Sequence, residues 1–142
     1  MNTRTSSRNL SPALTGLAVG LIGVTGVLHL VQAPQDLNEV AFRGVLFIAN
    51  GVLGLAAAYG IWRGSKTWAW LLGLLVAGGA LGFYVISRSI GIPGWEDSIG
   101  EWFEPIGVLS WLVEAGFVAM ALMAFTRTHE SQDLKEFATA QR

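Results

Sequence analysis

Residues 11–31 read SPALTGLAVGLIGVTGVLHLV and contain no Asp, Glu, Lys or Arg. A helix of this length can cross a bilayer core of about 30 Å, which needs roughly 20 apolar residues. Similar apolar stretches follow at 41–62, 67–90 and 105–125. Because backbone groups in lipid must be satisfied within each segment, we expect helices. The sequence therefore predicts an all-α integral membrane protein with four spans.

The first apolar stretch also has features of a secretory signal peptide. Arg4 and Arg8 precede it, and residues 31–33 (Val-Gln-Ala) loosely resemble a cleavage site. However, its apolar run is longer than the usual hydrophobic region of about 7–15 residues. Pro34 directly follows the cleavage position, which disfavours cleavage. We therefore interpret this stretch as a retained span.

The composition agrees with a membrane protein and excludes several other classes. Hydrophobic residues make up 52% of the 142 residues and charged residues 13%, whereas soluble domains carry about 25% charged residues. The net charge of −1 argues against a nucleic-acid partner. The absence of cysteine excludes disulfides, thiol catalysis and zinc–thiolate sites. We expect a polar segment at 1–10, one bundle at 11–126 and a polar tail at 127–142.

The connections and the basic residues predict the topology. Short connections at 33–40 and 63–66, and a longer one at 91–104, favour an antiparallel up-down-up-down bundle. Seven of the nine Lys and Arg residues fall on the side that holds both termini: Arg4, Arg8, Arg63, Lys66, Arg127, Lys135 and Arg142. The positive-inside rule then places both termini in the cytoplasm. We expect a multi-pass protein of the cytoplasmic membrane.

A set of polar side chains lies in the outer half of the predicted spans. Its main members are His29, Arg43, Tyr84, Arg88 and Glu114, and Thr25, Asn50 and Ser110 share helical faces with His29, Arg43 and Glu114. Ionisable groups within spans cost roughly 2.5–3.5 kcal/mol each and often mark functional sites. Glu114 is nine residues into its span, about 13 Å below the start at 1.5 Å per residue. If these groups converge, they form an outward-facing pocket for a small ligand, ion or quinone-like cofactor.

Structural alternatives exist for each of these residues. Arg43 and Arg88 can extend to lipid head groups, and His29 and Tyr84 can make ordinary packing contacts. Glu114 can belong to a structural ion pair. If the pocket forms, its arginines favour an anionic or quinone-like group.

Metal and cofactor signals are weak. His29 together with Glu39, Glu101 or Glu104 offers imidazole and carboxylate ligands, which suit zinc, iron, manganese or copper. No multi-histidine motif supports such a site, and haem would need a second intramembrane histidine. Glycine-rich phosphate-binding motifs are also absent. The cofactor is therefore unassigned, and we expect binding more than catalysis.

Glycine pairs spaced four residues apart predict close helix packing. Gly16 and Gly20 form one pair, continued by Gly23 and Gly26, and Gly78 and Gly82 form another. Such pairs let helix backbones approach in lipid, either within the chain or between copies in a homo-oligomer. They also leave open a second function, that of a non-catalytic accessory or assembly subunit of a larger membrane complex.

The last connection carries turn and capping signals. Pro93-Gly94 predicts a turn, and Pro105 suits the first position of a helix with Glu104 near its positive end. Glu101 and Glu104 would share one side of a helical turn.

Overall fold

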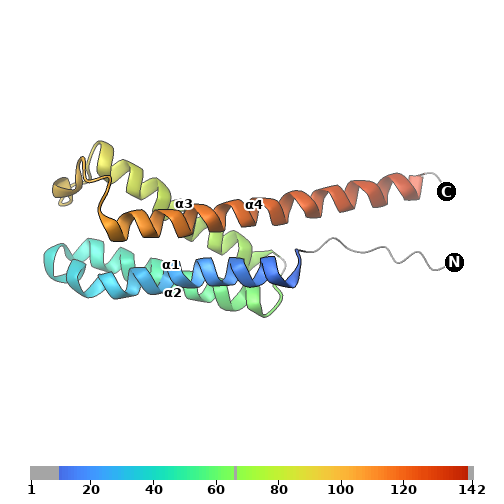
Figure 1. The fold of residues 1–142 in the computed structure, drawn as a ribbon, viewed down its shortest axis with the longest axis horizontal. Coiled ribbons are helices and arrows are strands. Elements are labelled where there is room, and N and C mark those ends of the chain that lie inside the picture. Colours follow the sequence, from blue (N-terminus) through green and yellow to red (C-terminus); the bar gives the residue numbers. More distant parts are fainter. Residues whose placement is uncertain (1–9, 66, 141–142) are drawn as a thin grey trace.

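The computed structural model describes residues 10–65 and 67–140, with side chains described as far as Thr126. Its elements are α1 (Pro12–Glu39), α2 (Ala41–Trp62), α3 (Trp68–Ser89), the 3-10 turn η1 (Glu96–Ser98) and α4 (Pro105–Ala140) (Figure 1). Each of the four α-helices contains a stretch long and apolar enough to cross a membrane. The predicted all-α, four-span architecture is confirmed.

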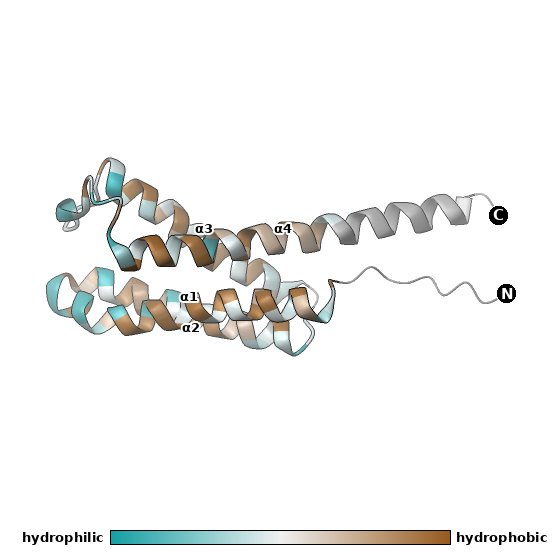
Figure 2. Cartoon of the chain, in the orientation of Figure 1, coloured by the Kyte–Doolittle hydropathy of each residue, from teal (hydrophilic) through white to brown (hydrophobic). Residues whose placement is uncertain are grey.

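The helices form an antiparallel bundle with two different ends. The α1–α2 and α3–α4 connections lie at one end, here named the loop end. The start of α1, the α2–α3 connection and the far part of α4 lie toward the other, named the terminal end (Figure 1). Hydrophilic residues concentrate at the loop end, and apolar residues cover the middle of the bundle (Figure 2).

The first helix is longer than predicted. The expected connection at 33–40 is helical as far as Glu39, and Pro34 lies inside the helix. Proline removes one backbone N–H and usually breaks a helix. Here the following turn is held by other bonds, because Asn38 donates to the Pro34 carbonyl at 2.9 Å. The α1–α2 connection is therefore reduced to Val40, whose backbone is extended.

Helix α4 also continues beyond its predicted span. It runs without interruption to Ala140, so much of the region predicted as a polar tail is helical. The apolar part suited to a membrane ends at Thr126.

Close packing of α1 on α2 depends on glycine, although largely not on the predicted pairs. A Cβ atom at Gly51 would lie 2.9 Å from the Gly26 carbonyl oxygen, so the two helices meet nearly backbone to backbone. By contrast, a Cβ atom at Gly16 or Gly20 would meet nothing within 4 Å. The same is true of the predicted pair in α3, Gly78 and Gly82. These two pairs do not bring helices together within the chain.

The apolar core lies toward the terminal end. Its residues are Ala18, Ile22, Ala57, Ala58, Ile61, Ala69, Trp70, Val76, Ala77, Phe117, Met120 and Ala121. Phe117 is fully buried and stacks on Trp70, with ring centroids 6.0 Å apart. Alanines and glycines let these large rings fill the space between the helices.

The α3–α4 connection folds back over the loop end. The Gly100 N–H donates to the Arg88 carbonyl at 3.0 Å, and three glycines in the connection have positive φ. Glu104 accepts hydrogen bonds from the backbone N–H groups of Ile106 and Gly107. The predicted cap of α4 is confirmed. Residues 102–103 form a turn between Glu101 and Glu104 but no helix; Glu101 is exposed, whereas Glu104 caps α4.

Candidate functional site

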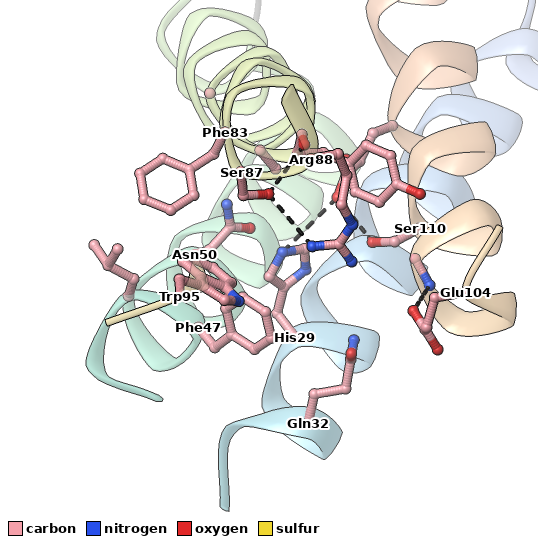
Figure 3. Close-up of a pocket in the computed structure, with 16 residues that line it drawn as sticks. His29, Gln32, Phe47, Asn50, Phe83, Ser87, Arg88, Trp95, Glu104 and Ser110 are labelled. Atoms are coloured by element: carbon pink, nitrogen blue, oxygen red, sulfur yellow. Dashed lines mark hydrogen bonds and ion pairs between the residues drawn. The ribbon is translucent and has the colours of Figure 1, made fainter. Parts of the chain in front are cut away.

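A cavity of about 280 Å³ lies among the helices in the loop-end half of the bundle. All four helices and the α3–α4 connection contribute to its wall (Figure 3). The lining residues are His29, Gln32, Leu46, Phe47, Asn50, Gly79, Ala80, Phe83, Tyr84, Ser87, Arg88, Trp95, Glu104, Gly107, Ser110 and Glu114. Four of the five predicted site residues therefore share one cavity.

His29 and Glu114 face each other across the inside of the bundle. His29 is 6% exposed and Glu114 is 2% exposed. The shortest distance between them, from His29 Nε2 to Glu114 Oε1, is 3.8 Å. Glu114 Oε1 also accepts a hydrogen bond of 2.9 Å from the Ser110 hydroxyl. The deep carboxyl group thus has an imidazole and a hydroxyl as neighbours.

The hydrogen bond of the other ring nitrogen of His29 determines which ring nitrogen carries the proton in the neutral ring. Nδ1 lies 2.9 Å from the carbonyl oxygen of Thr25, one turn earlier in α1. Since a carbonyl only accepts hydrogen bonds, Nδ1 must carry a proton. Nε2 is then an acceptor in the neutral ring and a donor in the cation. At 3.8 Å it is beyond hydrogen-bond range of Glu114, so this nitrogen is available to a ligand.

Arg88 and Tyr84 line the cavity and also hold the connection above it. Arg88 Nε donates to the Glu101 carbonyl at 2.9 Å, and the Tyr84 hydroxyl donates to the Trp102 carbonyl at 2.7 Å. The Arg88 guanidinium lies 4.7 Å from the centre of the Tyr84 ring. Arg88 Nη1 additionally donates to the Ser87 hydroxyl at 3.3 Å. Both side chains therefore couple the cavity wall to the fold of residues 91–104.

Aromatic rings form one side of the cavity. The Phe47 ring lies edge-on to His29 at 5.0 Å between centroids and to Trp95 at 6.1 Å. Phe83 lies 5.2 Å from Trp95. Trp95 comes from the connection rather than from a helix, and it is buried. Edge-on and tilted contacts of this kind suit the quadrupoles of aromatic rings, and all three of Phe47, Phe83 and Trp95 line the cavity.

Arg43 is the one predicted site residue that does not line the cavity. Its guanidinium pairs with Asp36 through Nε and with Glu39 through Nη2. It also lies 5.2 Å from the centre of the Trp95 ring. Arg43 therefore links the last turn of α1 to the connection, and its charge is compensated by two carboxylates.

The suggested metal ligands are not brought together. Glu39 pairs with Arg43 and accepts from Gln35, whereas Glu104 caps α4. Glu101 is exposed. Within the described residues, no three His, Asp or Glu side chains form a group that could hold a metal ion.

The connection contains one carboxyl group with a perturbed pKa outside the spans. The backbone N–H groups of Glu96 itself, Gly94 and Trp95 stabilise the Glu96 carboxylate, which lowers the pKa of Glu96. The hydrogen bond from the Gly94 N–H is 3.0 Å long.

Several lining residues were not among the predicted site residues. Ser87 directly precedes Arg88, and Gln32 lies one turn after His29, so extending the helical faces would have found both. The sequence offers Trp95 and Trp102 either as anchors at the membrane surface or as residues that stack on a ligand, and of these two Trp95 lines the cavity. Asn50 and Ser110, which the sequence places in the outer polar stripes, do line the cavity, and Asn50 Oδ1 is buried without a hydrogen-bond partner.

The fold defines a small multi-pass membrane protein with an internal cavity. Compared with known proteins, the chain matches no family model, no curated protein and no solved structure at a significant level. The function must therefore be argued from the cavity itself.

Proposed function

We propose that this protein binds a small, neutral, oxygen-bearing ring, such as a quinone, in the cavity of the loop-end half. The observation that carries this proposal is unused hydrogen-bonding capacity inside an aromatic-walled space. Asn50 Oδ1 is buried without a hydrogen-bond partner, and His29 Nε2 lies 3.8 Å from Glu114 Oε1, which is too far for a hydrogen bond. Buried polar groups are normally satisfied, so a ligand is a reasonable partner for them.

The charges around the cavity favour a neutral ligand over an anion. Arg88 is the one guanidinium in the wall, and the carboxyl groups of Glu104 and Glu114 are also there. Arg43, which would have added a second positive charge, is paired outside the wall. The anionic ligand suggested by counting arginines in the sequence loses most of its support.

Donors and acceptors in the wall suit a ring that carries carbonyl or hydroxyl groups. Arg88 uses two of its five N–H donors on described residues, which leaves donors for a carbonyl oxygen. The Glu114 carboxyl and His29 Nε2 can accept from a ring hydroxyl. Phe47, Phe83 and Trp95 offer surfaces for the ring itself.

We further propose that the loop end faces away from the cytoplasm in a cytoplasmic membrane. Seven of the nine Lys and Arg residues occur in the sequence before α1, between α2 and α3 or after the apolar part of α4, and this supports the orientation through the positive-inside rule. The cysteine-free chain allows a direct test with single-cysteine variants in intact cells. A membrane-impermeant thiol reagent should label Asp97→Cys and not Arg63→Cys, and the reverse pattern would overturn the orientation.

The binding test uses a tail-free dimethoxy-methyl-benzoquinone with the purified chain in lipid nanodiscs. Saturable quenching of tryptophan fluorescence is expected, because Trp95 lies in the cavity wall. Ala80→Phe would place a ring in the cavity and abolish the saturable component. The matched control is Ala49→Phe on an exposed position of α2, which should bind as the wild type does. Absence of saturable binding to the wild type would refute the proposal.

The polar half of the site has its own test. Glu114→Gln keeps the shape of the side chain and removes the carboxylate, so binding of the same probe should weaken about tenfold, equivalent to 1.4 kcal/mol. Glu101→Gln changes an exposed carboxyl group outside the wall and serves as control. Equal affinities for both variants would show that Glu114 has no part in binding.

A further inference from the structure

The cavity wall includes one residue at the middle of the membrane-spanning part of α3. Gly79 lies eleven residues after Trp68 and ten before Ser89, the two ends of the helix. It is exposed, and a Cβ atom built on it would meet nothing within 4 Å. The cavity therefore reaches a part of the helix surface that carries no side chain.

The surface around Gly79 is apolar. Leu75, one turn earlier, is 70% exposed, and Leu71, a further turn earlier, is 52% exposed. Ile86, seven residues after Gly79 and thus about two turns toward the end of α3, is exposed as well. In a bilayer such side chains face lipid, and the exposed glycines Gly78, Gly79 and Gly82 leave a gap in this apolar cover. Of these three, Gly79 borders the cavity.

The size of the cavity limits what it can enclose. Ligand pockets usually measure about 300–1,000 Å³, and this one measures about 280 Å³. It can hold a single substituted ring but not a long alkyl chain as well. A ligand with an alkyl chain needs a place for that alkyl chain outside the cavity. The open space beside Gly79 provides one.

We propose that the natural ligand is a membrane-dissolved amphiphile whose ring occupies the cavity and whose alkyl chain leaves past Gly79 into the lipid. This inference rests on the proposed binding function and extends it by naming the ligand class and its route. The ring then reaches His29 and Glu114 from the bilayer rather than from water. The alkyl chain of the ligand contributes affinity by contact with the apolar surface around Leu75.

The test compares two probes that share one ring, the tail-free benzoquinone and its decyl derivative, in nanodiscs. Affinity is expressed per mole fraction of probe in the lipid, so that partitioning does not count as binding. Gly79→Leu fills the gap and should weaken the decyl probe about tenfold or more. The tail-free probe should change less than about threefold.

The matched control is Gly78→Leu, because Gly78 is equally open but does not line the cavity. It should leave both affinities unchanged. Gly79→Ala, which adds one methyl group to open space, should give a smaller, selective loss for the decyl probe and serves if the leucine variant does not fold. If both probes bind the wild type and no Gly79 variant separates them, the exit route is wrong and the binding function stands. If neither probe binds the wild type, both proposals fail.

Discussion

The two halves of the bundle are built from similar apolar helices but pack differently. At the terminal end, Phe117 and Trp70 fill the space between small residues. At the loop end, polar and aromatic side chains surround a cavity, and α3 diverges from α2 (Figure 1). Membrane helices gain stability from close packing, so we expect the loop end, where a cavity replaces such packing, to contribute less to stability. The comparison indicates that one half holds the fold and the other holds the site.

The largest expected effect on stability comes from removing a buried ring at the terminal end. Phe117→Ala removes a fully buried ring and should lower the free energy of unfolding by about 3–5 kcal/mol, measured by titration with SDS in mixed micelles. Phe83→Ala should cost clearly less, because Phe83 already borders a cavity. Phe103, 89% exposed, provides the surface control. Equal losses at Phe117 and Phe83 would remove the distinction between the halves.

Arg43→Gln should have the next largest effect. It leaves the mostly buried Asp36 without its cation, and breaking a buried pair costs about 3 kcal/mol or more. The exposed Glu39 loses the same partner. Tryptophan emission should also shift, because Arg43 packs on Trp95. Arg63→Gln, at an exposed position, should be nearly neutral. Adding Asp36→Asn to Arg43→Gln should recover part of the loss, and a further loss instead would contradict the pairing.

A single methyl group at the α1–α2 contact should have a smaller effect. Gly51→Ala places a Cβ atom against Leu30 and the Gly26 carbonyl, and overpacking of this kind costs about 1–3 kcal/mol. Gly20→Ala meets open space and should be neutral or slightly stabilising within a helix. The SDS titration of both variants would reveal which glycines bring helices together. A larger loss at Gly20 would point to a contact outside this chain.

The smallest effect concerns pH at the loop end. Backbone N–H groups lower the pKa of Glu96 below its usual 4.5. A lowered pKa stabilises the fold above the pKa of the unfolded chain, and this contribution is lost as pH falls through the folded value. Trp95 emission should therefore change below pH 4.5, and Glu96→Gln should reduce that change. The neighbouring Asp97→Asn is the control, and it should leave the transition in place.

The sequence could predict the spans because each property involved is local. Four apolar stretches and the need to satisfy backbone groups in lipid gave four helices. Pro34 led to a wrong prediction of where α1 ends. Past Pro34, Asn38 bonds to the Pro34 carbonyl, and Asp36 and Glu39 pair with Arg43 of α2. These partners are close in sequence, and the spacing of Glu39 and Arg43 suits a pair, but the sequence does not show that the helix continues through a proline to bring them together.

The candidate site could be predicted only in part. His29, Tyr84, Arg88 and Glu114 stood out because ionisable and polar groups are costly in a membrane, and the fold brings them to one cavity. Arg43 stood out for the same reason, but its partners lie elsewhere. Trp95 and Trp102 were both candidates for stacking on a ligand, but the fold of an irregular connection decides which of them reaches the cavity, and it is Trp95.

By itself, the sequence determined that this chain has four apolar helices with costly polar groups toward one end, because hydropathy and helix length depend on consecutive residues. Only the tertiary structure decided which polar groups face a shared cavity and which neutralise one another. It also decided that Gly79, rather than the regular glycine pairs, borders the cavity. These outcomes depend on how helices rotate and cross, and that geometry follows from the packing of all four helices together.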